Sequence, residues 1–164
     1  MRLTKNFTLQ ELIYSATALR KNIDNTPTKE GVIKLRLLAA SLLQPLRNAV
    51  GSIRITSGYR SPALSEAIGS SSNSQHCRYE AVDLQHVKRG KMDNLKIYKA
   101  LIDLKLEFDQ CILEFGTSTK DIDGDPAWIH ISWKISDNRK QVLVAYKDDN
   151  NKTKYRSPIE YNCL

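Results

Sequence analysis

The strongest constraint on the fold is an apolar repeat in the first third of the chain. Apolar residues recur there every three or four positions, which places them on one face of a helix: Val32, Leu35, Leu38, Leu42, Leu46 and Val50. Thr26 and Pro27 predict the start of this helix, with proline at its first helical position, and Gly51 predicts its end. Because Pro45 removes one internal hydrogen bond, the pattern predicts a long helix with a kink.

Shorter helices and a group of strands follow from local signals. Residues 8–11 have the pattern of a capping box at the start of a short helix. Ser61-Pro62 predicts another helix, which Gly69 closes, and Asp93 is expected to cap a helix that runs to about residue 106. Strands are expected over residues 52–57, 80–84, 110–115, 127–133 and 141–146. Since helices come mostly before strands, we predict an α+β fold in which helices pack on a small antiparallel sheet.

The length of 164 residues fits one domain, 1–164, whose polar tail over residues 148–164 we expect to be loosely held. No run of about 18 apolar residues occurs, so we expect no membrane insertion. The N-terminus lacks the apolar stretch of a secretory signal, which predicts synthesis in the cytoplasm. The cysteines, Cys77, Cys111 and Cys163, are odd in number and far apart, so no disulfide framework is expected.

The net charge of +7 favours an anionic partner, such as nucleic acid or a bacterial wall rich in carboxylates and phosphates. The basic residues are scattered, and the densest run is Lys88-Arg89-Gly90-Lys91. The chain has neither interleaved aromatic residues nor a recognition-helix signature, so we do not expect nucleic acid to be the partner.

Three residues offer ligands for a metal ion. His76 and Asp83 lie seven residues apart, and His130 lies on the alternating segment 128–133. In a strand, that alternation puts His130 and Ser132 on one face with Trp128, where they can line a cleft. Two imidazole nitrogens and one carboxylate oxygen, with a fourth position open for water, are typical of a catalytic zinc site.

The segments around these residues resemble a known family. Four of them occur in the family's order: Ser57-Gly58-Tyr59-Arg60-Ser61-Pro62, Asn73-Ser74-Gln75-His76, Ala81-Val82-Asp83 and Trp128-Ile129-His130-Ile131-Ser132. They resemble the zinc peptidases of bacterial peptidoglycan, which include D-alanyl-D-alanine carboxypeptidases and phage L-alanyl-D-glutamate endopeptidases. The opening segment, residues 7–12, is similar to that of the small phage-type members. The family pattern is S-x-H-x-x-G-x-A-x-D followed by W-x-H, and this chain departs from it because Tyr79 stands at the glycine position.

The resemblance implies that His76, Asp83 and His130 bind Zn²⁺ and that Arg60 faces the metal and steadies the substrate carbonyl or the developing oxyanion. Ser74 and Gln75 are candidates for binding substrate or for bracing their loop, and Ser132 is a candidate hydrogen-bond donor beside His130. The remaining histidine, His86, lies outside the family pattern, and we expect it at the surface or behind the ligands.

Hydrolysis also needs a general base. Some family members carry an acidic residue three positions before the last histidine, but here that position is Ala127. Glu114, at the end of an apolar strand, is the first candidate, and Asp125 is the rival; Asp121 and Asp123 are weaker alternatives.

We therefore expect a zinc-dependent hydrolase of peptidoglycan stem peptides, of D,D-carboxypeptidase or L-alanyl-D-glutamate endopeptidase type. The short chain favours a monomeric phage-type endolysin or tail-associated lytic enzyme that acts on the bacterial wall. The alternative is a catalytically inactive wall-binding module on the same fold, which Tyr79 and Ala127 motivate.

Overall fold

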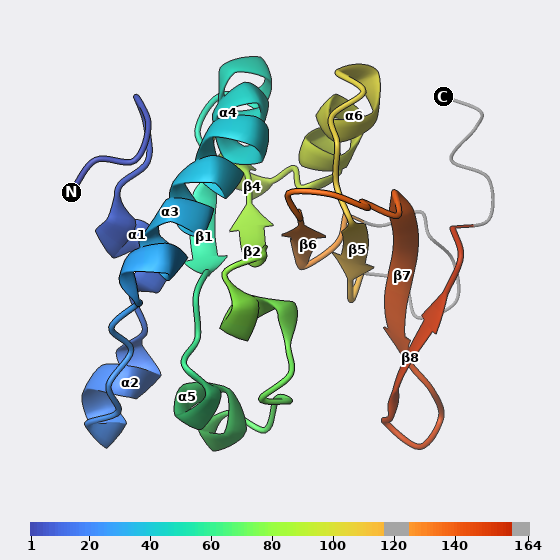
Figure 1. The fold of residues 1–164 in the computed structure, drawn as a ribbon. Coiled ribbons are helices and arrows are strands. Elements are labelled where there is room, and N and C mark those ends of the chain that lie inside the picture. The colour runs from blue at the N-terminus through green and yellow to red at the C-terminus, as the bar shows by residue number, and fades with distance from the viewer. Residues whose placement is uncertain (117–124, 159–164) are drawn as a thin grey trace.

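The computed structural model describes residues 1–116 and 125–158 (Figure 1). Its helical elements are α1 (Leu9–Ile13), α2 (Ala16–Lys21), α3 (Lys29–Leu38), the π-helix η1 (Ala39–Leu43), α4 (Gln44–Val50), α5 (Pro62–Ala67), the 3₁₀ helix η2 (Gln75–Arg78) and α6 (Leu95–Asp103). Its strands are β1 (Arg54–Ser57), β2 (Ala81–Gln85), β3 (Val87–Lys88), β4 (Lys91–Met92), β5 (Gln110–Glu114), β6 (Trp128–Ser132), β7 (Gln141–Lys147) and β8 (Thr153–Arg156). The fold is α+β, as predicted.

The main sheet has six strands in the order β1-β2-β6-β5-β7-β8. The prediction of an antiparallel sheet is wrong for one pair, because β5 and β7 run parallel. The edge of β6 away from β5 is already paired with β2, so the chain after β6 crosses to the free edge of β5 and runs in the same direction as β5. Strand β8 then pairs antiparallel with β7, within the tail that was expected to be loose.

The long predicted helix is present and is interrupted at the proline. The segments α3, η1 and α4 follow one another without a loop and appear in Figure 1 as one long coil beside β1 and β2. Pro45 has no N–H to donate to the preceding turn, and the turn before it is a π-helix, in which the N–H of Gln44 reaches the carbonyl of Ala39. The predicted start was wrong: Thr28 is the N-cap and its side chain accepts a hydrogen bond from the N–H of Gly31.

Two shorter helices begin where the sequence predicts. Thr8 and Glu11 form both hydrogen bonds of the capping box at α1. Ser61 caps α5, with Pro62 at the first helical position. Helix α2 and the β3–β4 hairpin were not predicted.

The core lies between the helices and one face of the sheet. The leucines of the apolar repeat are fully buried there against alternate residues of the central strands, among them Val82, Leu84, Ile129 and Ile131. Burying each such side chain stabilises the fold by about 1.5–3 kcal/mol. The apolar faces of β2 and β6 therefore point toward the helices, and the opposite faces point away from them. These opposite faces carry Asp83 and His130.

In the described part of the chain, no helix is long and apolar enough to cross a membrane. Cys77 and Cys111 form no disulfide, and Cys163 lies outside the described residues.

Candidate metal centre

The three predicted ligands come from three elements and meet at one point. Asp83 on β2 and His130 on β6 are direct partners in the antiparallel register. His76 lies on η2, in the loop that precedes β2, and its side chain is 2% exposed. The strands therefore fix two of the three side chains, whereas the position of His76 depends on its loop.

The separations of the candidate ligand atoms fit a small tetrahedral ion. Nε2 of His76 lies 3.3 Å from Nδ1 of His130 and 3.5 Å from Oδ1 of Asp83. Nδ1 of His130 lies 3.0 Å from the same Oδ1. Two ligands bonded at about 2.0–2.1 Å to a tetrahedral ion are about 3.3 Å apart, so all three pairs fit a zinc-sized ion.

A backbone carbonyl sets the tautomer of His76. Nδ1 of His76 donates to the carbonyl oxygen of Gly58 over 2.7 Å, which leaves the lone pair of Nε2 available to a metal. Gly58 is glycine for a local reason, because a Cβ there would overlap the carbonyl of Leu12. The N–H of Tyr59 donates to that same carbonyl over 2.7 Å, which holds the segment in place.

Electrostatics also favour the ligand forms of these groups. Burial lowers the pKa of His76 and outweighs the opposing effect of Asp83, so the neutral imidazole is favoured. Burial alone would raise the pKa of Asp83, but the imidazoles of His130 and His76, which lie 3.0 Å and 3.5 Å from its Oδ1, outweigh burial and hold the pKa well below its usual range. A neutral imidazole and an ionised carboxylate are the forms that coordinate metals.

A cavity of about 330 Å³ opens in front of the three residues and is also lined by Arg60, Glu114 and Tyr155. Nη1 of Arg60 donates to Oγ of Ser57 over 3.2 Å and lies 3.9 Å from Oδ2 of Asp83. The guanidinium thus lies beside the candidate ligands, and the Arg60 side chain is 15% exposed.

Glu114 enters the same cavity from the end of β5, opposite Trp128 of β6. Burial raises the pKa of Glu114 to about 7, an effect that the His130 side chain reduces only in part. Glu114 is therefore a carboxylate in the cavity whose proton affinity is set near neutrality.

Asp125, the rival candidate base, is used elsewhere. Its Oδ1 accepts a hydrogen bond of 2.8 Å from the N–H of Leu95, at the start of α6. This contact also corrects the predicted cap: the N-cap of α6 is Asn94, not Asp93, and the side chain of Asn94 donates to the carbonyl of Pro126 over 2.7 Å. Asp125 lines a different cavity, so the structure does not bring it to the candidate ligands. Asp121 and Asp123 lie outside the described residues.

Ser74 and Gln75 line the cavity and also brace their loop. Oγ of Ser74 accepts from the N–H of His76 over 3.3 Å, at the N-cap of η2. The side chain of Gln75 donates to Oδ2 of Asp109 over 3.0 Å. The geometry is therefore compatible with both roles that the sequence left open.

Ser132 does not line the cavity, although the sequence predicted that it would. It is fully buried, and its Oγ accepts from the N–H of Gln110 over 3.0 Å. The alternation of β6 gave its face correctly, but the neighbouring strand covers it, so a substrate in the cavity does not reach it.

Of the two positions expected for His86, the one at the surface is wrong. It is buried, and its Nδ1 lies 2.7 Å from the carbonyl oxygen of Ser52. His86 holds the segment before β1 and takes no part in the ligand set.

Two features of the site were missed. Asp109 is 1% exposed, and its carboxylate accepts a hydrogen bond from the side chain of Gln75. It also forms ion pairs with two basic residues, at 2.9 Å from Nζ of Lys134 and 2.6 Å from Nη2 of Arg139. Only its position directly before an apolar strand could have signalled it. Tyr155 reaches the cavity from β8, a strand with no apolar signal in the sequence.

The sheet register explains why Tyr155 belongs to the site. Glu114 lies opposite Ala145 of β7, and Ala145 lies opposite Tyr155. These three residues therefore form one row on the cavity face, with the small side chain of Ala145 between the carboxylate and the phenol ring.

Comparisons with known proteins agree with the resemblance. A family model described as Peptidase M15 matches residues 5–110, more than half of the chain, so the chain belongs to this family. His76 and Asp83 lie within the matched segment, whereas Glu114 and His130 follow it. No match was found among curated proteins.

A comparison with solved structures gave a match to a bacterial enzyme. It is the L-Ala D-Glu endopeptidase ChiX of Serratia marcescens, with 18% identity and a TM-score of 0.32, over 77% of this chain and 92% of that chain. A TM-score this low does not establish a shared fold, so the family assignment depends on the sequence match alone.

Proposed function

We propose that this member of the peptidase M15 family hydrolyses peptide bonds in the stem peptides of bacterial peptidoglycan, with Zn²⁺ bound by His76, Asp83 and His130. The observation that carries the proposal is the cluster of three ligand atoms within 4.8 Å of one another, at the edge of a cavity that also contains a carboxylate and a guanidinium. Two imidazoles and one carboxylate suit zinc better than calcium or magnesium, which prefer oxygen ligands. When bound, zinc would polarise the substrate carbonyl and lower the pKa of the attacking water.

We assign the general base to Glu114. Its carboxylate takes a proton from the attacking water as the oxygen bonds to the substrate carbonyl carbon. The same carboxyl then gives the proton to the leaving amine nitrogen as the C–N bond breaks. A pKa of about 7 supports this assignment, because a group that both takes and returns a proton works best near the operating pH.

Arg60 is assigned to the developing oxyanion. Its guanidinium lies at the cavity beside Asp83, and its Nε is buried without a hydrogen-bond partner among the described residues. A planar fork of donors held in place before substrate arrives stabilises negative charge that appears only in the transition state. Ser74 and Gln75 are proposed to contact the peptide at the same edge of the cavity.

The biological setting is part of the proposal. The opening segment is similar to that of phage-type members, and a net charge of +7 favours an anionic wall. We propose that the chain acts as a monomeric, single-domain lytic enzyme on the cell wall. The six-stranded sheet, whose first strand begins at Arg54 and whose last ends at Arg156, supports a single domain.

The alternative, an inactive wall-binding module, was motivated by Tyr79 and Ala127. Two observations favour the enzyme. Glu114 supplies a carboxylate to the cavity where position 127 does not, and Tyr79 adopts a backbone conformation that glycine would also adopt.

The deciding experiment is digestion of purified peptidoglycan by the metal-loaded protein, followed by mass spectrometry of the released muropeptides. We expect about one Zn²⁺ per chain and new peptide ends, and the mass of the fragments identifies the bond that is cut. The matched control is His130→Ala under the same conditions. Binding of peptidoglycan with zinc present but no new ends would favour the inactive module.

A further inference from the structure

We propose that Tyr79 is a positioning residue for the metal centre. Its ring, seated on Gly31 of α3 and stacked on Tyr59, locks together the two loops that hold the His76 imidazole. This inference rests on the proposed metal site at His76, and it concerns a residue at which the chain departs from the family pattern.

The backbone at Tyr79 is unusual for a residue with a side chain. Tyr79 is the C-cap of η2 and has φ 64° and ψ 26°, in the left-handed region. Glycine adopts this region freely, and among other residues asparagine and aspartate do so most readily. An aromatic residue persists there only if its contacts offset the strain. The family pattern has glycine at this position, which is the residue that adopts the left-handed region most freely.

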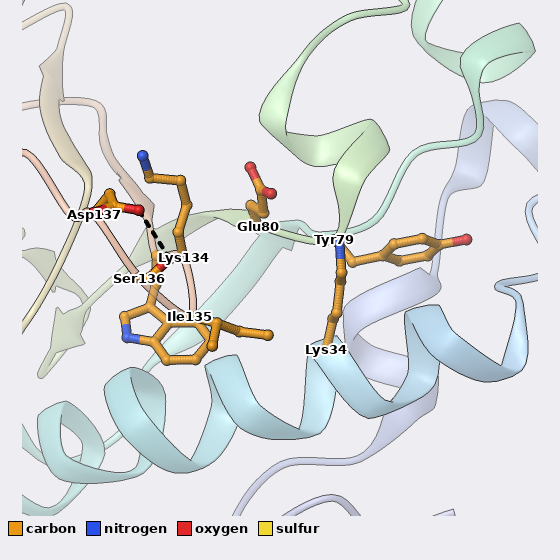
Figure 2. A pocket seen from close by; sticks show the side chains of 8 residues that line it. Lys34, Tyr79, Glu80, Lys134, Ile135, Ser136 and Asp137 are labelled. Atoms are coloured by element: carbon orange, nitrogen blue, oxygen red, sulfur yellow. Dashed lines mark hydrogen bonds between the residues drawn. The ribbon is translucent and has the colours of Figure 1, made fainter.

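The contacts of the ring supply that compensation. The rings of Tyr79 and Tyr59 stack with centroids 4.2 Å apart and an angle of 16° between their planes. The hydroxyl oxygen of Tyr79 accepts a hydrogen bond of 3.2 Å from the N–H of Thr28, the N-cap of α3. Figure 2 shows the Tyr79 side chain lying along α3, beside Lys34.

Gly31 makes room for this ring. A Cβ at Gly31 would overlap three atoms of the Tyr79 ring, so no other residue fits there while the ring is in place. Glycine near the start of a helix is otherwise unfavourable compared with alanine. Gly31 in α3 therefore leaves the space that the Tyr79 ring occupies. Position 79 is the one at which the family pattern has glycine.

The stack connects to the metal site on both sides. Tyr79 lies three residues after His76, and its N–H points at the carbonyl oxygen of His76 over 3.4 Å. Tyr59 follows Gly58, whose carbonyl accepts the Nδ1–H of His76 over 2.7 Å. Joining Tyr59 to Tyr79 thus fixes the loop that carries the imidazole against the loop that orients it.

The first test is a double-mutant cycle on metal-free protein, with urea unfolding as the measurement. Gly31→Ala should destabilise the wild-type protein because the new methyl group meets the Tyr79 ring. In the Tyr79→Gly background the same substitution should stabilise, because alanine is the better helix former and the ring is gone. Equal effects of Gly31→Ala in both backgrounds would overturn the packing part of the proposal.

The second test is the Zn²⁺ dissociation constant, measured by competition with a chelator. Tyr79→Gly should raise it about 10–100-fold, the usual effect of losing a group that orients a ligand. Tyr79→Phe keeps the ring and should stay within about threefold of wild type. Lys105→Gly is the matched control: Lys105 also has a positive φ, of 51°, but is exposed beyond α6, so this variant should not change the dissociation constant.

A Tyr79→Gly protein that is folded and binds Zn²⁺ as tightly as wild type would overturn the positioning role. Failure of the proposed metal site looks different, because the wild-type protein itself would then bind no Zn²⁺. Failure of the proposed hydrolysis would leave wild-type protein that binds Zn²⁺ but releases no new peptide ends. The unfolding cycle needs no metal, so it tests the Gly31–Tyr79 contact in either case.

Discussion

Glu114→Gln should make the metal-free protein more stable at pH 8 while removing most of its activity when metal is bound. Glu114 is partly buried at the end of β5, and this burial raises its pKa from 4.5 to about 7. Glutamine has nearly the same shape but neither ionises nor accepts a proton. Both consequences have one cause, which is the raised pKa of the Glu114 carboxyl group. A pKa near neutrality suits proton transfer, and the buried carboxyl group destabilises the folded state once it ionises.

The pH dependence has a definite sign. Below pH 4.5 the group is protonated in the folded and the unfolded chain, and it contributes nothing. Between 4.5 and about 7 only the unfolded chain loses its proton, so the stability of the wild-type protein falls as the pH rises through this window. Above pH 7 both states are ionised and the full cost of burying the charge remains. Glu114→Gln removes this cost, so its gain is small at pH 5 and complete at pH 8.

The interval between 4.5 and about 7 corresponds to roughly 3 kcal/mol at 1.36 kcal/mol for each pH unit. Because Glu114 is only partly buried and solvent screens its charge, we expect a gain of about 1–2 kcal/mol at pH 8. Any effect of the amide itself on packing is the same at both pH values, so it cancels in the difference between pH 8 and pH 5.

The assay is urea unfolding of metal-free wild-type and Glu114→Gln protein at pH 5 and pH 8, with kcat/KM on a defined stem peptide measured in parallel. Activity should fall about 10²–10⁴-fold, the usual size of a general-base contribution, while the zinc content stays the same. Glu66→Gln is the matched control, since the same chemical change on the exposed surface of α5 should alter neither quantity. The reasoning is refuted if Glu114→Gln gains no stability between pH 5 and pH 8. The base assignment fails if this variant stays active and Asp125→Asn is inactive.

Three further predictions follow from the site. His76→Ala and His130→Ala should each lose Zn²⁺ and activity together; full zinc occupancy in both variants would contradict the ligand assignment. Arg60→Ala should lower kcat/KM about 10²–10³-fold, and Arg60→Lys should recover little, because a point charge does not replace a two-pronged contact. Activity should rise with pH as Glu114, whose pKa is about 7, loses its proton. This rise should keep its position in both Arg60 variants, because arginine stays charged throughout. An Arg60→Ala enzyme of normal rate would mean that the arginine only braces its loop. Tyr155→Ala should raise KM more than it lowers kcat, because Tyr155 lines the cavity on β8 without belonging to the ligand set; an unchanged KM would place the peptide elsewhere.

The parts of the fold that local chemistry dictates could be predicted. The capping box at Thr8 and the Ser61-Pro62 start of α5 depend on residues a few positions apart, and both are present. The alternation of β6 gave the correct face for His130, since successive side chains in a strand must point to opposite sides.

Partner choice between distant segments could not be predicted from the same signals. The parallel pairing of β5 with β7 depends on which strand edge remains free after β2 and β6 have paired, and no local pattern records this. Asp125 looked like a turn residue or a base, but its carboxylate accepts a hydrogen bond from the N–H of Leu95, the first residue of α6, which lies 30 positions earlier in the chain.

Burial of residues at the ends of strands could not be predicted from the sequence either. Ser132 has the correct face for a cleft residue, yet the N–H of Gln110 on the next strand already occupies its hydroxyl oxygen. Asp109 shows the converse case, because a carboxylate that looks exposed in the sequence is the buried acceptor for Lys134 and Arg139.

The way the three candidate ligands are held predicts where the proposed metal site is most easily lost. Asp83 and His130 are cross-strand partners in the middle of the sheet, so their separation follows from the spacing between neighbouring strands. His76 has no such support: its imidazole is oriented by one carbonyl, and its loop is closed by a tyrosine in the left-handed region. Substitutions around Gly58 and Tyr79 should therefore weaken metal binding more than substitutions of equal size around β2 and β6, even though none of them touches the metal. The sheet fixes two of the candidate ligands through its hydrogen bonds, and the third depends on side-chain packing that differs from the family pattern.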